Sequence, residues 1–189
     1  MQQSIELIRG TDGQAVQAVL CSITQSHIHD YENLWQDLLQ RSGQDDKFWN
    51  WAFKQRVFLS RGNYEGYAIE CAGRTEGLLL LETQQHRSQY QAQLVRGEPL
   101  VYVESIAAAP WNRRIIFRPP EFRGIGTTLL LFARQRSIEL GYGGRVGLHS
   151  LPDSESFYDS QNMLRFDSDP DEYYDTDEPP LTYFEYPAR

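Results

Sequence analysis

Residues 101–142 read VYVESIAAAPWNRRIIFRPPEFRGIGTTLLLFARQRSIELGY. The stretch begins with the pattern of a β-strand, passes through an Arg-rich loop, tightens at the tetrapeptide RGIG (123–126) and continues with the apolar spacing of a helix. Glycines allow backbone conformations that other residues avoid, and the first N–H groups of a helix have no partner within it. Such a helix start binds phosphate readily. The stretch therefore predicts either a phosphate-binding strand–loop–helix junction or an ordinary loop that closes onto a helix.

Two common phosphate-binding motifs are excluded. A P-loop requires a Gly-Lys pair, which occurs nowhere in the chain. A dinucleotide fingerprint requires a third glycine at position 129, which is Leu129 here. With both motifs excluded, the stretch is a G-x-G turn followed by a long amphipathic helix. The glycines from Gly141 onward are expected to end that helix.

The composition is that of a folded globular protein. Its 189 residues are 40% hydrophobic and 13% aromatic, which favours a single domain over 1–189. With 18 basic and 26 acidic residues, the net charge of −8 argues against a nucleic-acid partner. The N-terminus lacks a signal segment and the longest apolar run, 77–81, is too short to span a bilayer. We therefore expect a cytoplasmic protein with no membrane partner.

Cysteine and histidine usage points to no metal site. Cys21 and Cys71 are the only cysteines, so two buried thiols in a reduced compartment are expected. His27 and His29 are two residues apart with no further ligand pattern. His149 lies on a short expected strand, where a lone histidine is more often a packed residue than a catalyst.

Periodicity and turn residues predict an α+β chain. Strands are expected over 4–9, 64–71, 77–83, 99–108, 145–151, 163–166 and 181–186. Helices are expected over 11–22, from Asp30, from Asp45 or Asp46, over 124–140 and over 152–161. Residues 72–76 suit a hairpin connection, and Asn162 suits a left-handed helix end. The aromatic group over 48–53 is either core packing or a substrate-facing wall.

Three motifs stand in chain order: VESIAAAP at 103–110, EFRGIG at 121–126 and FYDSQNM at 157–163. Together they resemble the GNAT superfamily of acetyl-CoA-dependent acyltransferases. EFRGIG at 121–126 resembles the pyrophosphate motif [RQ]-x-x-G-x-G/A of that family. VESIAAAP at 103–110 resembles the fourth strand that precedes the motif, and FYDSQNM at 157–163 resembles the F-Y-x-x-x-G-F helix end. The combination of APWNR, RGIG, GLHSLP and FY is similar to a little-characterised bacterial branch.

The resemblance implies a fold and an activity. The fold would be a mixed, mostly antiparallel sheet of six to seven strands, with the G-x-G helix after the fourth strand and helices on both faces. The activity would be transfer of an acetyl group from acetyl-CoA to a primary amine, by direct attack within a ternary complex. The rival interpretation is a non-catalytic acyl-CoA-binding or protein-interaction module with the same fold. A longer acyl group, a hydroxyl acceptor and a homodimer are left open.

The resemblance also implies site residues. Glu104 would be the base and Tyr158 the acid that protonates the leaving thiolate, although each suits a structural role as well. The cofactor-binding set would be Ile106, Ala107, Ala108, Arg123, Gly124, Ile125, Gly126 and Thr127. Candidates for the adenosine 3′-phosphate are Arg113, Arg114, Arg118 and Arg134, each of which also suits a solvated basic face.

The chain departs from the family pattern at four places. Glu121 stands where Arg or Gln is usual, and Leu151 where many relatives have Asn. Asn162-Met163 replaces Gly-Phe, and the loop 110–123 is longer than typical. The acidic stretch 167–178 suits a solvated loop or a rim that attracts a cationic amine such as a polyamine.

Overall fold

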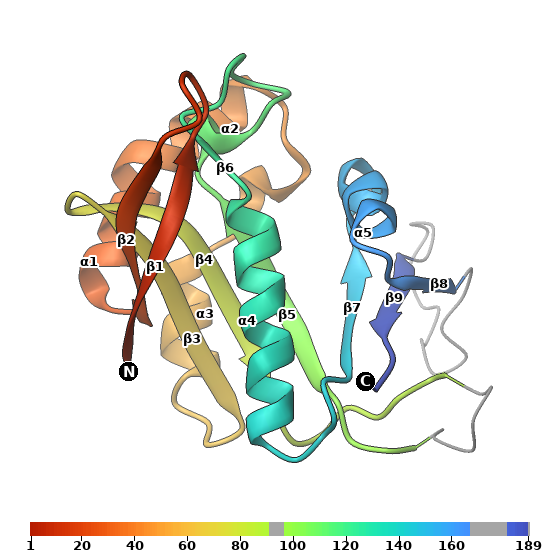
Figure 1. Cartoon of the computed structure of the whole chain (residues 1–189). Helices are drawn as coiled ribbons and strands as arrows, with labels where there is room; N and C mark the ends of the chain where they lie inside the picture. Colours follow the sequence, from red (N-terminus) through yellow and green to blue (C-terminus); the bar gives the residue numbers. More distant parts are fainter. Residues whose placement is uncertain (91–96, 167–180, 189) are drawn as a thin grey trace. The chain divides into compact units, whose positions relative to one another are not determined.

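The computed structural model describes residues 1–90, 97–166 and 181–188. The chain divides into two compact units, Met1–Leu80 with Ser105–Leu130 and Leu81–Glu104 with Leu131–Arg189 (Figure 1). Strands β4 (Arg74–Glu82) and β5 (Val101–Ala108) and helix α4 (Ile125–Glu139) contribute residues to both units. The expectation of a single domain over 1–189 stays a prediction.

The first unit contains the strands β6-β1-β2-β3-β4-β5 in that order. Their bounds are Gln2–Arg9 for β1, Ala15–Ser22 for β2, Tyr64–Cys71 for β3 and Phe122–Arg123 for β6. Strand β1 pairs antiparallel with both β2 and β6, and β2 pairs antiparallel with β3. The pairing of Ile8 with Arg123 places the end of β1 beside the residue that precedes the G-x-G helix.

The helix predicted over 11–22 is wrong, because these residues form a hairpin turn and strand β2. The Asp12 carboxylate accepts the Gln14 N–H at 3.0 Å, and Gly13 adopts a φ of +73°. These residues therefore make a tight turn rather than a helix start. The valines of β2 then favour a strand that pairs on both sides, with β1 and β3.

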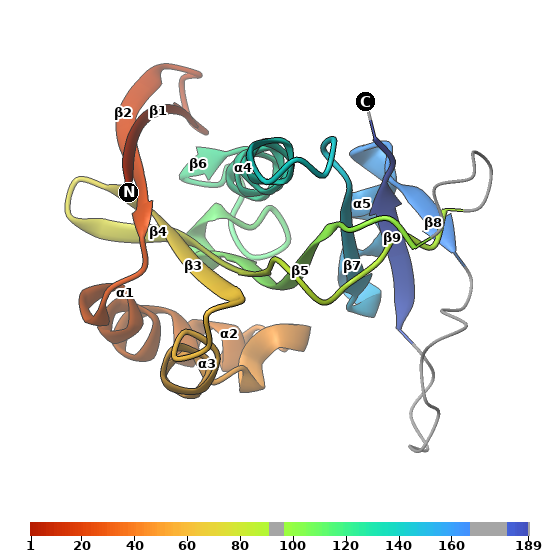
Figure 2. The same cartoon turned by 90° about the horizontal axis from the view of Figure 1, so that it is seen from below.

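Helices cover both faces of the first unit's strands (Figure 2). One face carries α1 (Gln25–Asp30), a π-helical turn (Tyr31–Trp35), α2 (Gln36–Arg41), a short 3₁₀ turn (Asp45–Phe48) and α3 (Trp51–Phe58). The start of α4 covers the other face, where a side chain at Gly77 would collide with Ile125 and Leu129. The buried cluster on the first face consists of Ile28, Tyr31, Trp35, Leu39, Trp51, Ala68, Leu78, Leu80, Ala107 and Ala109.

Two predicted helix starts, at Asp30 and at Asp45 or Asp46, differ in the structure. Asp30 ends α1 and precedes the π-helical turn without capping it, because its carboxylate accepts from the Thr75 N–H at 2.9 Å instead. Asp45 begins only a 3₁₀ turn, whereas Asn50 caps α3 by accepting the Phe53 N–H at 2.7 Å. The aromatic group over 48–53 is divided, because Trp51 is in the core whereas Phe48 is 80% exposed.

The second unit contains the strands β5-β7-β9-β8 and the short helix α5 (Glu155–Ser160). The bounds are Val146–Ser150 for β7, Leu164–Phe166 for β8 and Thr182–Tyr186 for β9. Strands β5 and β7 are parallel, and the other pairs are antiparallel. Asn162 has the expected left-handed φ of 58°, and Gly141, at φ +81°, follows α4 as expected.

The α+β class is confirmed, but the strand count differs. The described residues contain nine strands in the sheet instead of six to seven, because β2 and the two-residue β6 were not expected. The G-x-G helix α4 consequently follows the sixth strand and not the fourth. No helix in the described part of the chain has the length and apolar composition that a bilayer span requires.

We expect both thiols to react slowly in the folded protein. Burial raises the pKa of Cys21 and of Cys71, and the carboxylates of Glu70 and Glu76 respectively raise them further. Because the thiolate is the reactive form, alkylation by iodoacetamide at pH 8 should be at least about tenfold slower in the native protein than in urea. Equal rates in the two states, followed by mass spectrometry, would contradict this prediction.

Candidate active site

The parallel strands β5 and β7 are paired over a short length. Their register contains Val101 with Val146 and Tyr102 with Gly147. In the second unit, Val103 and Glu104 therefore lie beyond the paired part of β5. Exposure along β5 alternates, so that Tyr102 and Glu104 are half-exposed between buried neighbours. A strand that leaves its neighbour in this way presents backbone N–H and C=O groups that an extended ligand can pair with.

The predicted acid and base belong to the same unit. Tyr158 lies on α5 and is only 5% exposed, with its ring centroid 5.5 Å from that of Phe184 on β9. Glu104 is half-exposed on β5. A buried phenol and an accessible carboxylate suit an acid and a base respectively, although their roles stay predictions.

The continuation of β5 in the first unit has one packed and two accessible positions. Ala107 is 4% exposed and packs in the buried cluster, whereas Ile106 and Ala108 are half-exposed. The Ala108 carbonyl accepts from the Arg113 Nε–H at 2.9 Å. This part of β5 therefore packs closely on one face and is partly exposed on the other.

The predicted phosphate cradle has the geometry of an open helix start. Gly124 has a φ of +82°, and the first backbone bond of the α4 turn runs from the Thr128 N–H to the Gly124 carbonyl at 2.8 Å. The N–H groups of Ile125, Gly126 and Thr127 belong to the first helical turn, which cannot satisfy its own donors. The arrangement can bind an anion through backbone groups and the helix dipole.

The loop before this cradle is held by close backbone contacts. The Gly10 N–H donates to the Glu121 carbonyl at 2.7 Å, and Arg123 donates to the Gly10 carbonyl at 2.5 Å. A Cβ at position 10 would lie 1.7 Å from the Pro120 carbonyl oxygen, so only glycine fits there. Arg123 thus fixes the loop through its guanidinium, a role that the sequence did not indicate.

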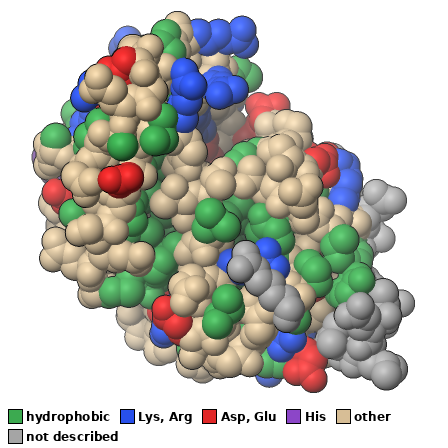
Figure 3. All heavy atoms as spheres, in the orientation of Figure 1, with side chains coloured by type: hydrophobic (Ala, Val, Ile, Leu, Met, Phe, Trp, Pro, Cys, Tyr) green, Lys and Arg blue, Asp and Glu red, His purple; other side chains and the backbone are tan. Residues whose placement is uncertain are grey.

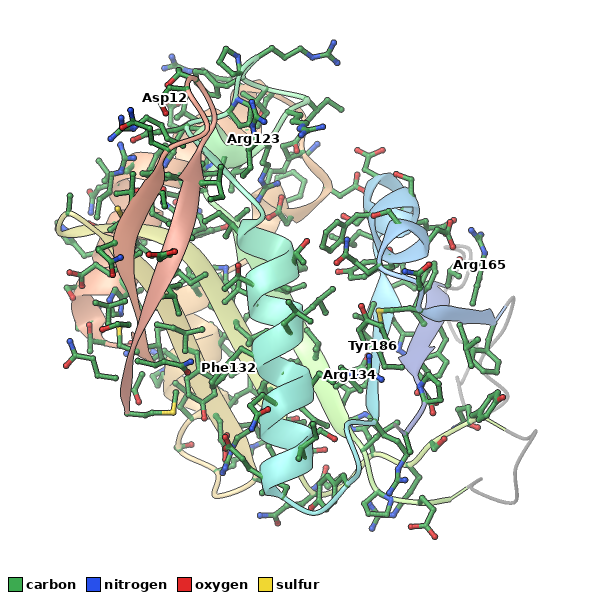
Figure 4. All side chains as sticks on the ribbon, in the orientation of Figure 1. Asp12, Arg123, Phe132, Arg134, Arg165 and Tyr186 are labelled. Carbon is green, nitrogen blue, oxygen red and sulfur yellow. The ribbon has the colours of Figure 1, made fainter. Side chains whose placement is uncertain are left out.

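Two of the four arginines considered for the 3′-phosphate contact other side chains. Arg113 binds both oxygens of Asp46, at 2.8 and 2.6 Å. Arg134 projects from α4 over the Tyr186 ring, 4.6 Å from its centroid (Figure 4). Arg114 and Arg118 are exposed. Figure 3 shows Lys and Arg side chains gathered at the end of the first unit that carries the β1–β2 turn. The phosphate role stays a prediction for Arg114 and Arg118.

Glu121, the departure from the pyrophosphate motif, pairs with Arg74 at 2.6 Å. The same guanidinium contacts Glu76 at 2.8 Å, and Glu76 is fully buried. Glu76 also accepts from the Trp111 indole at 2.6 Å and the Asn112 amide at 2.7 Å. The long loop is therefore anchored through its first residues. A pocket of about 250 Å³ adjoins this network and is lined by Cys71, Ala72, Arg74, Glu76, Glu121 and Phe122.

A histidine–tyrosine cluster in the second unit was not expected from the sequence. The Tyr102 hydroxyl and the His149 Nδ1 are 2.7 Å apart. The ring of His86 stacks on Tyr102 at 3.9 Å, and the ring of Tyr183 lies 5.1 Å from that of His149. His86 Nδ1 lies 2.9 Å from the fully buried carboxylate of Glu82. Only the strand alternation, which places Tyr102 two residues before Glu104, could have drawn attention to this cluster.

The first unit has an open G-x-G helix start, and the second unit has a short parallel strand pair followed by a Tyr-bearing helix. No protein-family model matches the chain, and a search of curated protein sequences finds no match either. Solved structures do match it. An acetyltransferase from Streptococcus agalactiae aligns over 89% of this chain and 96% of its own, with a TM-score of 0.58 and 10% identity.

Two further structures give the same result. The GNAT domain of S. lividans PAT covers 98% of this chain and 96% of its own, with a TM-score of 0.57 and 13% identity. Arabidopsis thaliana NAA60 in complex with acetyl-CoA covers 89% of this chain and 97% of its own, with a TM-score of 0.55 and 15% identity. The chain therefore has the GNAT fold. Among the described residues, no group of three or more His, Cys, Asp or Glu could hold a metal ion.

Proposed function

We propose that this chain is an N-acetyltransferase that transfers the acetyl group of acetyl-CoA to a primary amine. The observation that supports the proposal most is the open N-terminus of α4, which follows Gly124 in a chain with the GNAT fold. The first-turn N–H groups and the left-handed glycine suit a pyrophosphate, and the structure of NAA60 with this fold is a complex with acetyl-CoA. The half-exposed positions Ile106 and Ala108 on β5 suit a place beside the extended pantetheine arm.

In the proposed reaction, Glu104 takes a proton from the acceptor nitrogen as that nitrogen attacks the thioester carbon. The carbon–sulfur bond then breaks, and Tyr158 donates its proton to the leaving thiolate. Burial of Tyr158 keeps its ring out of water, which suits a proton donor. The acidic stretch 167–178, considered for attraction of a cationic acceptor, lies outside the described residues.

The second candidate function is a non-catalytic acyl-CoA-binding or protein-interaction module. It is favoured by the engagement of Glu121 with Arg74 and by Leu151 in the place of a usual Asn. The two functions are separated by an assay of free-thiol release from acetyl-CoA across a panel of primary amines, alongside thermal unfolding with and without CoA. Thiol release with any amine supports the enzyme. Stabilisation by CoA without thiol release for any amine supports the binding module.

Gly124→Ala should raise the KM for acetyl-CoA by about tenfold and change kcat little. A Cβ at Gly124 meets no atom within 4 Å, so the cost comes from the φ of +82° alone. This strain, about 1–2 kcal/mol, is relieved by movement of the cradle. Gly141→Ala is the matched control, because its φ is +81° and its surroundings are equally open. It should lower stability similarly and leave the KM unchanged. Equal KM values for the two variants would contradict a phosphate site at Gly124.

A further inference from the structure

One segment of the first unit differs from the rest of the chain in its charge and aromatic content. Residues 47–64 contain four basic and six aromatic residues and no acidic residue, in a chain whose net charge is −8. Lys47 and Lys54 in this segment are the only two lysines of the chain. The segment comprises the end of the 3₁₀ turn, helix α3 and the connection to β3. None of its residues takes part in the proposed reaction.

Several large aromatic side chains of this segment reach solvent. Phe48 is 80% exposed and Phe53 is 46% exposed. Trp49 and Phe58 are half-buried, because they pack against the core cluster on their inner side. The ring of Phe58 lies 6.4 Å from that of Phe53 and 4.9 Å from that of Tyr64. Exposed aromatic side chains that lie together in this way mark an interaction site.

Both lysines lie over these aromatic rings. The Lys47 Nζ is 5.2 Å from the centroid of Phe48, and the Lys54 Nζ is 5.1 Å from that of Trp49 and 5.9 Å from that of Phe58. Cation–π attraction holds the ammonium groups there. Positive charge and apolar area therefore form one surface. This aromatic–basic surface consists of Lys47, Phe48, Trp49, Phe53, Lys54 and Phe58.

We propose that the aromatic–basic surface binds an acidic segment of a partner protein, one in which apolar side chains alternate with carboxylates. The carboxylates pair with the two ammonium groups and with Arg61, whose guanidinium lies 5.6 Å from the centroid of Phe58. The edges of aromatic rings carry partial positive charge and suit carboxylates as well. The apolar side chains of the segment cover Phe48 and Phe53. This binding does not depend on the proposed acetyltransferase function.

Other anionic partners fit this surface less well. Single-stranded nucleic acid stacks its bases on the faces of aromatic rings, whereas here the lysines lie over the faces of Phe48, Trp49 and Phe58. A bilayer takes up the apolar face of a helix, but the Trp51 face of α3 is buried in the core. The net charge of −8 also repels an extended polyanion, while a short segment meets only the local positive charge.

The test uses a pool of dodecapeptides with Asp or Glu at alternate positions and Leu or Phe between them, each labelled with fluorescein at its amino end. Fluorescence anisotropy with the whole chain should show saturable binding. Raising NaCl from about 50 mM to about 300 mM should weaken it about fivefold or more, because salt screens the charges. Phe48→Ala should weaken it about tenfold and Lys47→Gln about fivefold. The exposure of Phe48 means that its truncation leaves the core intact.

Two variants serve as matched controls. Ile115→Ala truncates another large exposed apolar side chain of the first unit, 69% exposed on the long loop. Arg87→Gln removes an exposed positive charge of the second unit. Both should bind the peptide pool as the wild type does.

The site is located in the unaltered protein by labelling of its amines. Because the chain has only two lysines, an amine-reactive ester reports on this surface directly. Saturating peptide should slow the acylation of Lys47 and Lys54 by about threefold or more. The amine of Met1, a residue that is 59% exposed, should keep its rate and is the internal reference for mass spectrometry.

The inference is overturned if the pool does not bind, if Phe48→Ala binds it as tightly as the wild type, or if the two lysines are labelled equally fast with and without it. Oligothymidylate and phosphatidylserine vesicles are assayed in parallel. Tighter binding of either one, lost in Phe48→Ala, would assign the surface to a nucleic acid or to a bilayer and overturn the inference as well. If a variant fails to fold, labelling of the wild-type protein decides. The assay contains no acetyl-CoA, so its outcome is separate from that of the proposed function.

Discussion

Glu76→Ala is expected to lower the free energy of unfolding by about 3–5 kcal/mol, the range for removing one partner of a buried ion pair. Glu76 is fully buried and receives donors from three side chains, those of Arg74, Trp111 and Asn112. Alanine would leave the indole N–H without its carboxylate and would free the long loop from β4. Chemical denaturation of the two proteins measures the difference.

The control for this prediction is Asp37→Ala. Asp37 pairs with Arg41 at 2.9 Å, but both side chains are well exposed, at 64% and 76%. Such surface pairs contribute less than about 1 kcal/mol, so this variant should unfold almost as the wild type does. If Glu76→Ala lost no more stability than Asp37→Ala, the loop would not be anchored by the buried carboxylate.

Stability should also depend on pH through this group. Burial raises the pKa of Glu76 above its ordinary value, although Trp111, Asn112 and Arg74 act in the opposite direction. The folded state therefore binds a proton more tightly than the unfolded state. The contribution of this group is fully present below the unfolded pKa and is lost as pH rises through the folded one. Glu76→Gln removes this dependence.

The sequence predicted those elements whose signals are local. Helix α4 lies between Gly124 and Gly141, and strands β3 and β4 meet at a Gly-containing hairpin turn, so the boundaries of each are encoded within a few residues. Strand β2 was mistaken for a helix because its capping pattern is equally compatible with a turn. What decides between them is pairing with β1 and β3, and β3 is distant in the sequence.

Site residues could be predicted where the motif lies within one stretch of sequence, as at Gly124. They could not be predicted where a residue's role depends on a partner far away in the sequence. Arg113 and Asp46 are 67 residues apart in the sequence, so the assignment of Arg113 to structure instead of phosphate binding required the fold. Tyr102 and His149 are 47 residues apart, and no local pattern connects them. From the sequence, Glu121 predicts the loss of a side-chain contact to phosphate. In the structure its carboxylate pairs with Arg74.

Tyr158→Phe is expected to lower kcat by about 10²–10³-fold, the range for loss of a general acid. The change removes only the hydroxyl, because the phenylalanine ring can keep the contacts with Phe157 and Phe184. Binding of acetyl-CoA does not use this proton, so the KM for acetyl-CoA should stay within about twofold of the wild-type value. Steady-state thiol release at saturating amine measures both constants.

Tyr186→Phe provides the matched control. Tyr186 is 6% exposed, close to the 5% of Tyr158, and its hydroxyl donates to the Gln161 carbonyl just after α5. Loss of that bond should cost about 1 kcal/mol of stability and leave kcat unchanged. A general acid at Tyr158 requires the two variants to differ in kcat while both remain folded. If Tyr158→Phe turned over as fast as Tyr186→Phe, the phenol would be a buried structural group and the proton of the leaving thiol would come from elsewhere.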